Sequence, residues 1–161
     1  MNNNKTYIEL LVNSIGTKAK VLDEIILITK EQEKMLSIGS NMDIDKFNDS
    51  TEEKGVLIDR LNELNDGFEL LYSRVKDEFI TNKEQYKAEI ITIQDLIKLV
   101  TEKSIQIQAM EKRNRSAFEI YMTNQKKEIK DFKISSKTAT SYYKNMADQH
   151  QGQSYFLDKK K

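Results

Sequence analysis

The chain has 161 residues, the size of one ordinary domain, and its 26 basic and 26 acidic side chains give a formal net charge of zero. It contains no Cys, no Pro and no Trp, and only five Gly. The lack of Cys excludes a disulfide framework, a thiolate metal site and a cysteine nucleophile. The scarcity of Gly and Pro argues against a turn-rich β fold, so the composition indicates an all-α protein.

Charge and hydropathy limit where the protein acts. The first residues, MNNNKTYIELLVNS, lack the apolar stretch of a secretory signal, and charged residues recur too often for an 18-residue apolar run. We therefore expect a cytoplasmic protein without stable membrane insertion. From Lys126 to Lys161 the chain carries nine Lys and four acidic residues, a net charge of +5, so the preceding part carries −5. This basic tail has no Arg, the residue that dominates contacts with phosphates and bases, and we expect no nucleic-acid partner.

Apolar residues at heptad spacing predict a first long helix over about residues 5–38. One seven-residue register holds four apolar residues and one threonine: Ile8, Ile15, Leu22, Thr29 and Leu36. Gly16 lies inside this seam, where a glycine destabilises a helix by about 1 kcal/mol relative to Ala. We interpret Gly16 as a site of close packing or of tolerated weakness.

Residues 39–43 form the clearest break in the pattern. Gly39 suits the left-handed position that ends a helix, and Asp43 suits the N-cap of the next one. A second helix is then predicted over about residues 43–81, with a regular 4-3-4-3-4 apolar spacing from Leu57 to Val75. The seam positions between Phe47 and Leu57 are polar, so we expect the first turns of this helix to be exposed or frayed.

The end of the second helix is marked less clearly, because apolar positions continue in phase beyond it. Thr81 and Glu84 have the spacing of a capping box, and Asn82 between them can adopt a left-handed conformation, which predicts a tight turn there. The third helix is predicted over about residues 83–135. Short connections and single seams together predict an elongated antiparallel three-helix bundle of coiled-coil hairpins. Its predicted core includes Leu61, Leu64, Phe68, Leu71, Ile97, Val100 and Ile107.

Two polar residues, Glu111 and Asn114, interrupt the seam of the third helix. They predict either a polar layer that fixes the register of the bundle or an exposed groove beyond the ends of shorter neighbouring helices. Neither interpretation gives these residues a catalytic role.

No motif in the sequence predicts catalysis or metal binding. Oxygen-bearing residues approach the spacing of a calcium-binding EF-hand loop at Asn41, Asp43, Asp45, Asp49 and Glu52. However, Lys46 stands where the turn of that loop calls for glycine. His150 is the single histidine, so neither a zinc ligand set nor a Ser/His/Asp triad can be assembled. We expect no enzyme activity, no metal and no cofactor.

The C-terminal tail is predicted to be a separate unit, residues 136–161, following a bundle of residues 1–135. It carries apolar residues that a terminus of this length has little means of burying: Tyr142, Tyr143, Met146, Tyr155, Phe156 and Leu157. Segments of this kind commonly bind a partner as an amphipathic helix, and we assign these six residues to partner binding. The alternative is that the stripe of Tyr142, Tyr143 and Met146 folds back on the bundle.

Three parts of the chain carry a resemblance to a known family. The second predicted helix runs from DIDKF into TEEKGVLIDRL, the third contains LIKLV followed by MEKRN, and the tail contains SYYKNM and YFLDKK. These stretches resemble the second helix, the third helix and the C-terminal segment of the FlgN family of flagellar export chaperones.

The resemblance implies a cytoplasmic type III export chaperone that needs no cofactor. Family members bind hook–filament junction proteins, of the FlgK and FlgL type, keep them unassembled and deliver them to the flagellar export apparatus. Contact with these proteins is made by the C-terminal segment, which here corresponds to Tyr142, Tyr143 and Met146, and also to Tyr155, Phe156 and Leu157. The alternative function is that of a structural coiled-coil adaptor or tether with no role in export.

Overall fold

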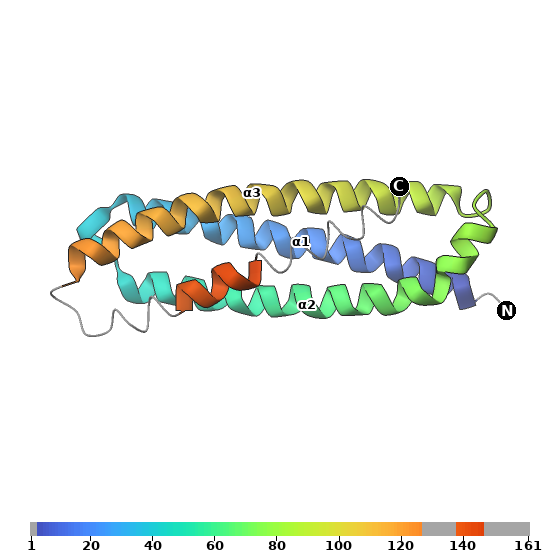
Figure 1. Ribbon diagram of the computed structural model, residues 1–161, viewed down its shortest axis with the longest axis horizontal. Coiled ribbons are helices and arrows are strands. Elements are labelled where there is room, and N and C mark those ends of the chain that lie inside the picture. Colours follow the sequence, from blue (N-terminus) through green and yellow to red (C-terminus); the bar gives the residue numbers. More distant parts are fainter. Residues whose placement is uncertain (1–2, 127–137, 147–161) are drawn as a thin grey trace.

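The computed structural model, which describes residues 3–126 and 138–146, is an elongated bundle of three long helices (Figure 1). The helices are α1 (Asn3–Ser37), α2 (Ile44–Thr81) and α3 (Lys87–Gln125), with a short 3₁₀ helix, η1 (Gly39–Asn41), between the first two. At a rise of 1.5 Å per residue, each long helix measures about 55 Å. Residues 138–146 form a further short helix, which we call the docked segment. The predicted all-α bundle is confirmed.

Hydrogen bonds and ion pairs between the helices establish their directions. As α1 advances, the residue numbers of its partners in α2 fall, in the pairs Lys18–Asn65, Thr29–Lys54 and Gln32–Ser50. The numbers of its partners in α3 rise, in the pairs Asp23–Lys103 and Thr29–Asn114. The bundle therefore runs up, down and up. α1 contacts both other helices along its length, whereas α2 and α3 make few contacts with each other.

The first turn has the local structure that its residues predict. Gly39 ends α1 with a φ of 78°, in the left-handed region that glycine occupies without a steric penalty. Asp43 is the N-cap of α2, and its carboxylate accepts a hydrogen bond from the backbone N–H of Lys46 at 3.2 Å. Both predictions for this turn are confirmed.

The second turn is longer than predicted. α2 ends at Thr81 as expected, but α3 begins at Lys87 rather than at residue 83. The predicted left-handed Asn82 is wrong, because its φ is −118° and its backbone N–H bonds back to the Glu78 carbonyl at 2.8 Å. The predicted capping box is also absent: the residue at the N-cap of α3 is Tyr86, not Thr81.

Burial of an aromatic ring explains the extra residues in this turn. Tyr86 is buried, and its ring meets that of Phe79 edge-on, with the centroids 6.0 Å apart. The turn must be long enough to return this ring to the core before α3 can start. At its other end, α3 stops at Gln125, and the predicted continuation as far as residue 135 falls almost entirely outside the described residues.

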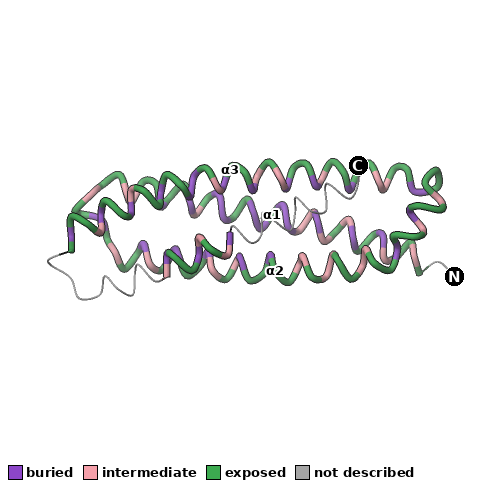
Figure 2. The backbone as a smooth tube through the Cα atoms, in the orientation of Figure 1, coloured by how far each residue is buried: buried purple, intermediate pink, exposed green. Residues whose placement is uncertain are grey.

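The main core runs along the inner faces of the three helices, as Figure 2 shows. Four residues of the predicted core are buried: Leu61, Ile97, Val100 and Ile107. Three others on α2 are only partly buried, although they pack against the core: Leu64, Phe68 and Leu71. The predicted full burial of these three is therefore wrong. The difference follows from the arrangement, because α2 is covered mainly by α1 and has few contacts with α3.

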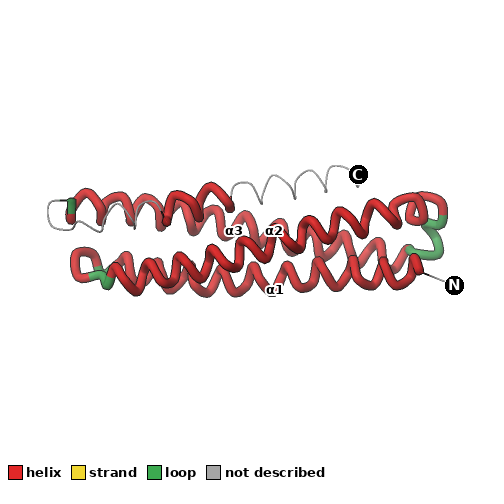
Figure 3. Tube along the Cα trace, turned by 90° about the horizontal axis from the view of Figure 1, so that it is seen from below, coloured by secondary structure: helices red, strands yellow, loops and turns green. Residues whose placement is uncertain are grey.

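The docked segment lies on the side of the bundle away from α1 (Figures 1 and 3). Its Ala139 joins a second apolar cluster at the end of the bundle that contains η1, where the rings of Phe47 and Phe118 stack with centroids 5.1 Å apart. Its Tyr142 and Met146 join the main core. Among the described residues, no helix is both long enough and apolar enough to cross a lipid bilayer.

Candidate partner-binding site

The structure places three of the six residues assigned to partner binding. Tyr142 and Met146 are 3% and 4% exposed, and Tyr143 is partly buried. Tyr155, Phe156 and Leu157 lie outside the described residues. Ala139, Tyr142 and Met146 are spaced by three and four residues, so they share one face of the short helix, and that face is turned toward the bundle. For these residues the structure shows the folded-back position that the sequence left as an alternative.

The docked segment joins the two helices that otherwise make few contacts. The ring centroid of Tyr142 lies 4.1 Å from Nζ of Lys54 on α2, a cation–π contact. The ring of Tyr143 lies 5.9 Å from the guanidinium of Arg115 on α3. The two tyrosine rings meet edge-on at 5.6 Å. The docked segment therefore contacts both α2 and α3 through aromatic side chains.

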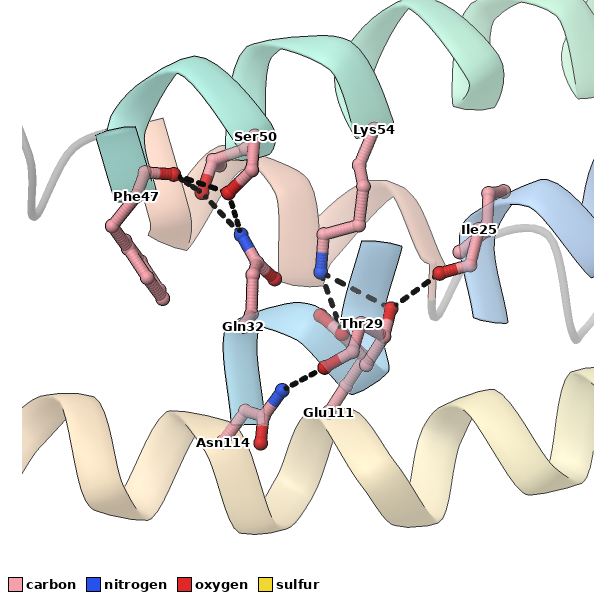
Figure 4. A network of polar contacts seen from close by, with 9 residues as sticks. Ile25, Thr29, Gln32, Phe47, Ser50, Lys54, Glu111 and Asn114 are labelled. Carbon is pink, nitrogen blue, oxygen red and sulfur yellow. Dashed lines mark hydrogen bonds and ion pairs between the residues drawn. The ribbon is translucent and has the colours of Figure 1, made fainter. Parts of the chain in front are cut away.

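Figure 4 shows a buried ion pair between Lys54 on α2 and Glu111 on α3. The Tyr142 ring lies against its ammonium group. Lys54 is only 1% exposed, and its Nζ donates to Oε1 of Glu111 at 2.7 Å. The same nitrogen lies 3.4 Å from Oγ1 of Thr29 on α1, and that hydroxyl donates to the carbonyl of Ile25 at 2.7 Å. All three helices thus contribute to the environment of a single ammonium group.

Further hydrogen bonds extend this pair into a polar layer, defined here as Thr29, Gln32, Ser50, Thr51, Lys54, Glu111 and Asn114. The Asn114 amide donates to the Thr29 carbonyl at 3.1 Å. The Gln32 amide donates to the hydroxyls of Ser50 and Thr51, at 2.8 and 3.0 Å (Figure 4). All seven residues are buried. Of the two interpretations of Glu111 and Asn114, the structure shows the polar layer.

The expectation that the first turns of α2 are exposed or frayed is wrong. Phe47, Ser50, Thr51 and Lys54 are all buried there. Polar side chains can be buried at these positions because α1 and α3 supply hydrogen-bonding partners at the same height. The sequence contained a signal for this, because the seams of all three helices carry polar residues at the same level of the bundle. The burial of Lys54 cannot be predicted when each helix is considered alone.

Burial sets the electrostatics of the layer. It lowers the pKa of Lys54 and raises the pKa of Glu111, and the attraction between the two groups offsets each shift in part. Burial and the nearby Glu111 charge also raise the pKa of Tyr142 well above its usual value. Within the part of the chain that is described, Oε2 of Glu111 and the Tyr142 hydroxyl are buried without a hydrogen-bond partner. This part of the layer is therefore incompletely satisfied.

A second buried lysine lies on α1. Lys18 is 7% exposed and donates a hydrogen bond to Oδ1 of Asn65 on α2. Burial lowers the pKa of Lys18 to about 7, because the protonated ammonium loses its water.

The residues that approach an EF-hand spacing do not form a loop. Positions 44–52 are helical, so Asp45 and Asp49 project from the first turns of α2. In the two described ranges, no cluster of three or more metal-binding side chains is present. What the geometry does provide is a surface that binds a short amphipathic helix through apolar and cation–π contacts.

Comparison of the chain with models of protein families, with curated proteins and with solved structures gave no match.

Proposed function

We propose that the protein is a cytoplasmic flagellar export chaperone of the FlgN kind, which binds hook–filament junction proteins through its C-terminal tail. The observation that carries the proposal is the docked segment, a nine-residue helix whose inward face consists of Ala139, Tyr142 and Met146. A helix this short is marginal in water, so it forms against whatever apolar surface it meets. Its own bundle is one such surface, and the assembly helix of a junction protein would be another.

The resemblance in sequence adds the identity of the client to this argument. SYYKNM, the stretch similar to the C-terminal segment of export chaperones, supplies Tyr142, Tyr143 and Met146. We expect the assembly helix of a junction protein to carry an apolar face, as helices that pair in this way do. A chaperone tail that covers this face keeps the client unassembled, and no nucleotide or metal is needed.

Titration of a purified junction protein, or of its terminal-helix peptide, tests the proposal. We expect the full chain to bind, and a chain truncated after Phe132 to show at least a hundredfold weaker binding. Replacing Tyr142 and Tyr143 together by Ala should weaken binding by a few kcal/mol if they are anchor residues. Leu70→Ala, on an exposed face of α2, is the matched control and should leave affinity unchanged. Equal affinities for the full and truncated chains would contradict the proposal.

The alternative is a structural coiled-coil adaptor without an export role. It is favoured by one observation: Tyr142 and Met146 already have partners within the bundle. An adaptor of this kind would leave the docked segment in place, and the same titration would detect no junction-protein binding to either chain.

A further inference from the structure

The Lys54–Glu111 pair is covered from two sides. On the side of α1, the Thr29 hydroxyl lies 3.4 Å from Nζ of Lys54. On the other side, the Tyr142 ring lies 4.1 Å from the same nitrogen, and the docked segment that carries this ring lies on the face of the bundle away from α1 (Figure 3). The docked segment therefore supplies the cover that separates the pair from water on that face.

Covering an ion pair opposes docking. Two charges taken out of water lose hydration, and their mutual attraction often repays less than the loss. Here Oε2 of Glu111 and the Tyr142 hydroxyl are both buried with no hydrogen-bond partner among the described residues. When the segment moves away, these two atoms and the ammonium regain water. The apolar contacts of Ala139 and Met146 and the cation–π contact between Tyr142 and Lys54 act in the opposite direction and favour docking.

We propose that the buried Lys54–Glu111 pair weakens the docking of residues 138–146 and so keeps this segment releasable from an otherwise stable bundle. An apolar pair of similar size at these two positions would hold Tyr142 more tightly. The inference concerns the chain alone and does not depend on the identity of any client.

Thiol labelling measures the release directly, because the chain contains no cysteine. Ala139→Cys places a thiol on the docked segment at a position that is 5% exposed, and Ala19→Cys places a matched thiol on α1 at one that is 7% exposed. The first thiol reacts with Ellman's reagent when the segment is released, and the second reacts only when the bundle opens. In the full chain we expect Ala139→Cys to react at least tenfold faster than Ala19→Cys.

Two changes at the ion pair then have opposite expected effects. Lys54→Met together with Glu111→Met replaces both charges by unbranched apolar side chains, and it should slow the labelling of Ala139→Cys at least tenfold. Lys54→Met alone leaves the Glu111 carboxylate unpaired beneath Tyr142, and it should speed this labelling several-fold. If only the added hydrophobicity mattered, both variants would slow the labelling of Ala139→Cys. The labelling of Ala19→Cys should not become faster in the double variant.

Labelling of Ala139→Cys that is unchanged or faster in the double variant would overturn the proposal. Faster labelling of Ala19→Cys in the double variant would overturn it as well, because the ion pair would then stabilise the whole bundle rather than weaken the docking of residues 138–146.

Discussion

At the scale of single residues, the two buried lysines differ in their partners. Lys54 has the Glu111 carboxylate at 2.7 Å, whereas Lys18 bonds to the neutral amide oxygen of Asn65. The charge on Lys54 is consequently compensated inside the protein, and the charge on Lys18 is opposed by burial alone. The two residues should therefore respond differently to pH.

Lys18 should make the stability of the protein depend on pH between about 7 and 10.5. Its pKa is about 7 in the folded chain and 10.5 in the unfolded chain, so the unfolded chain binds the extra proton in this range. The free energy of unfolding therefore falls as the pH is lowered from 10.5 to 7. Below pH 7 both states bind the proton, so Lys18 causes no further change in the free energy of unfolding. Lys18→Met should raise the free energy of unfolding at pH 7 by roughly 2–4 kcal/mol, at about 1.4 kcal/mol per pKa unit.

Urea unfolding at pH 7 and at pH 10 measures the effect. The difference between Lys18→Met and the parent chain should shrink at the higher pH. Lys20→Met, at an exposed position of the same helix, is the control and should show no such difference. An effect of Lys18→Met that is equal at both pH values would show that packing, not ionisation, is responsible.

At the scale of secondary-structure elements, Gly39 and Gly16 differ in backbone conformation. Gly39 has a φ of 78° at the end of α1, whereas Gly16 lies within that helix, and a Cβ atom added there would meet no atom within 4 Å apart from its neighbours along the same helix. The structure thus decides between the two interpretations of Gly16: it is a tolerated weakness and not a site of close packing.

Alanine should have opposite effects at these two glycines. Gly39→Ala places a Cβ atom in the left-handed region and should lower the free energy of unfolding by about 1 kcal/mol. Gly16→Ala should raise it by about 0.5–1 kcal/mol, because alanine loses less backbone entropy in a helix. Chemical denaturation of both variants measures these two changes in the free energy of unfolding. Destabilisation by Gly16→Ala would mean that the helix needs the glycine there.

Two leucines one turn apart on α2 should differ in their contribution to stability. Leu61 is fully buried, and Leu64 is only partly buried at the flank of the helix. Leu61→Ala should therefore lower the free energy of unfolding by about 2–4 kcal/mol, and Leu64→Ala by about 1 kcal/mol. Equal losses in a denaturant titration would show that α2 has a second covering surface along the Leu64 flank.

Heptad spacing was sufficient to predict the number and order of the three long helices, because each apolar seam can be recognised within its own segment. It was not sufficient at Lys54, where burial depends on which side chains face the residue from α1 and α3. The same limit applies to Tyr142: its apolar character was evident, but its position against Lys54 depends on how the chain returns after α3. Tyr86 displaced the predicted turn for a similar reason, since its ring packs against Phe79.

At the scale of the whole molecule, α1, α2 and α3 supply most of the residues of the main core, and the docked segment supplies Tyr142 and Met146. Truncation after Phe132 should therefore leave a helical, cooperatively unfolding bundle. It should also lower the melting temperature by about 5 °C, because Ala139, Tyr142 and Met146 no longer cover their neighbours. Circular dichroism against temperature measures both effects. A truncated chain that is unfolded at room temperature would show that the docked segment is an essential part of the core.

The polar layer also affects how the chain folds during its synthesis. Glu111 follows Lys54 by 57 residues, so a ribosome adding about 5–20 residues per second needs roughly 3–11 s to pass from one to the other. In the later part of that interval, once Thr81 has also left the ribosome, the hairpin of α1 and α2 carries the Lys54 ammonium group on its inner face without the Glu111 carboxylate. Water must occupy this level of the nascent hairpin until α3 emerges and displaces it. The protein therefore completes its interior only when its last long helix arrives.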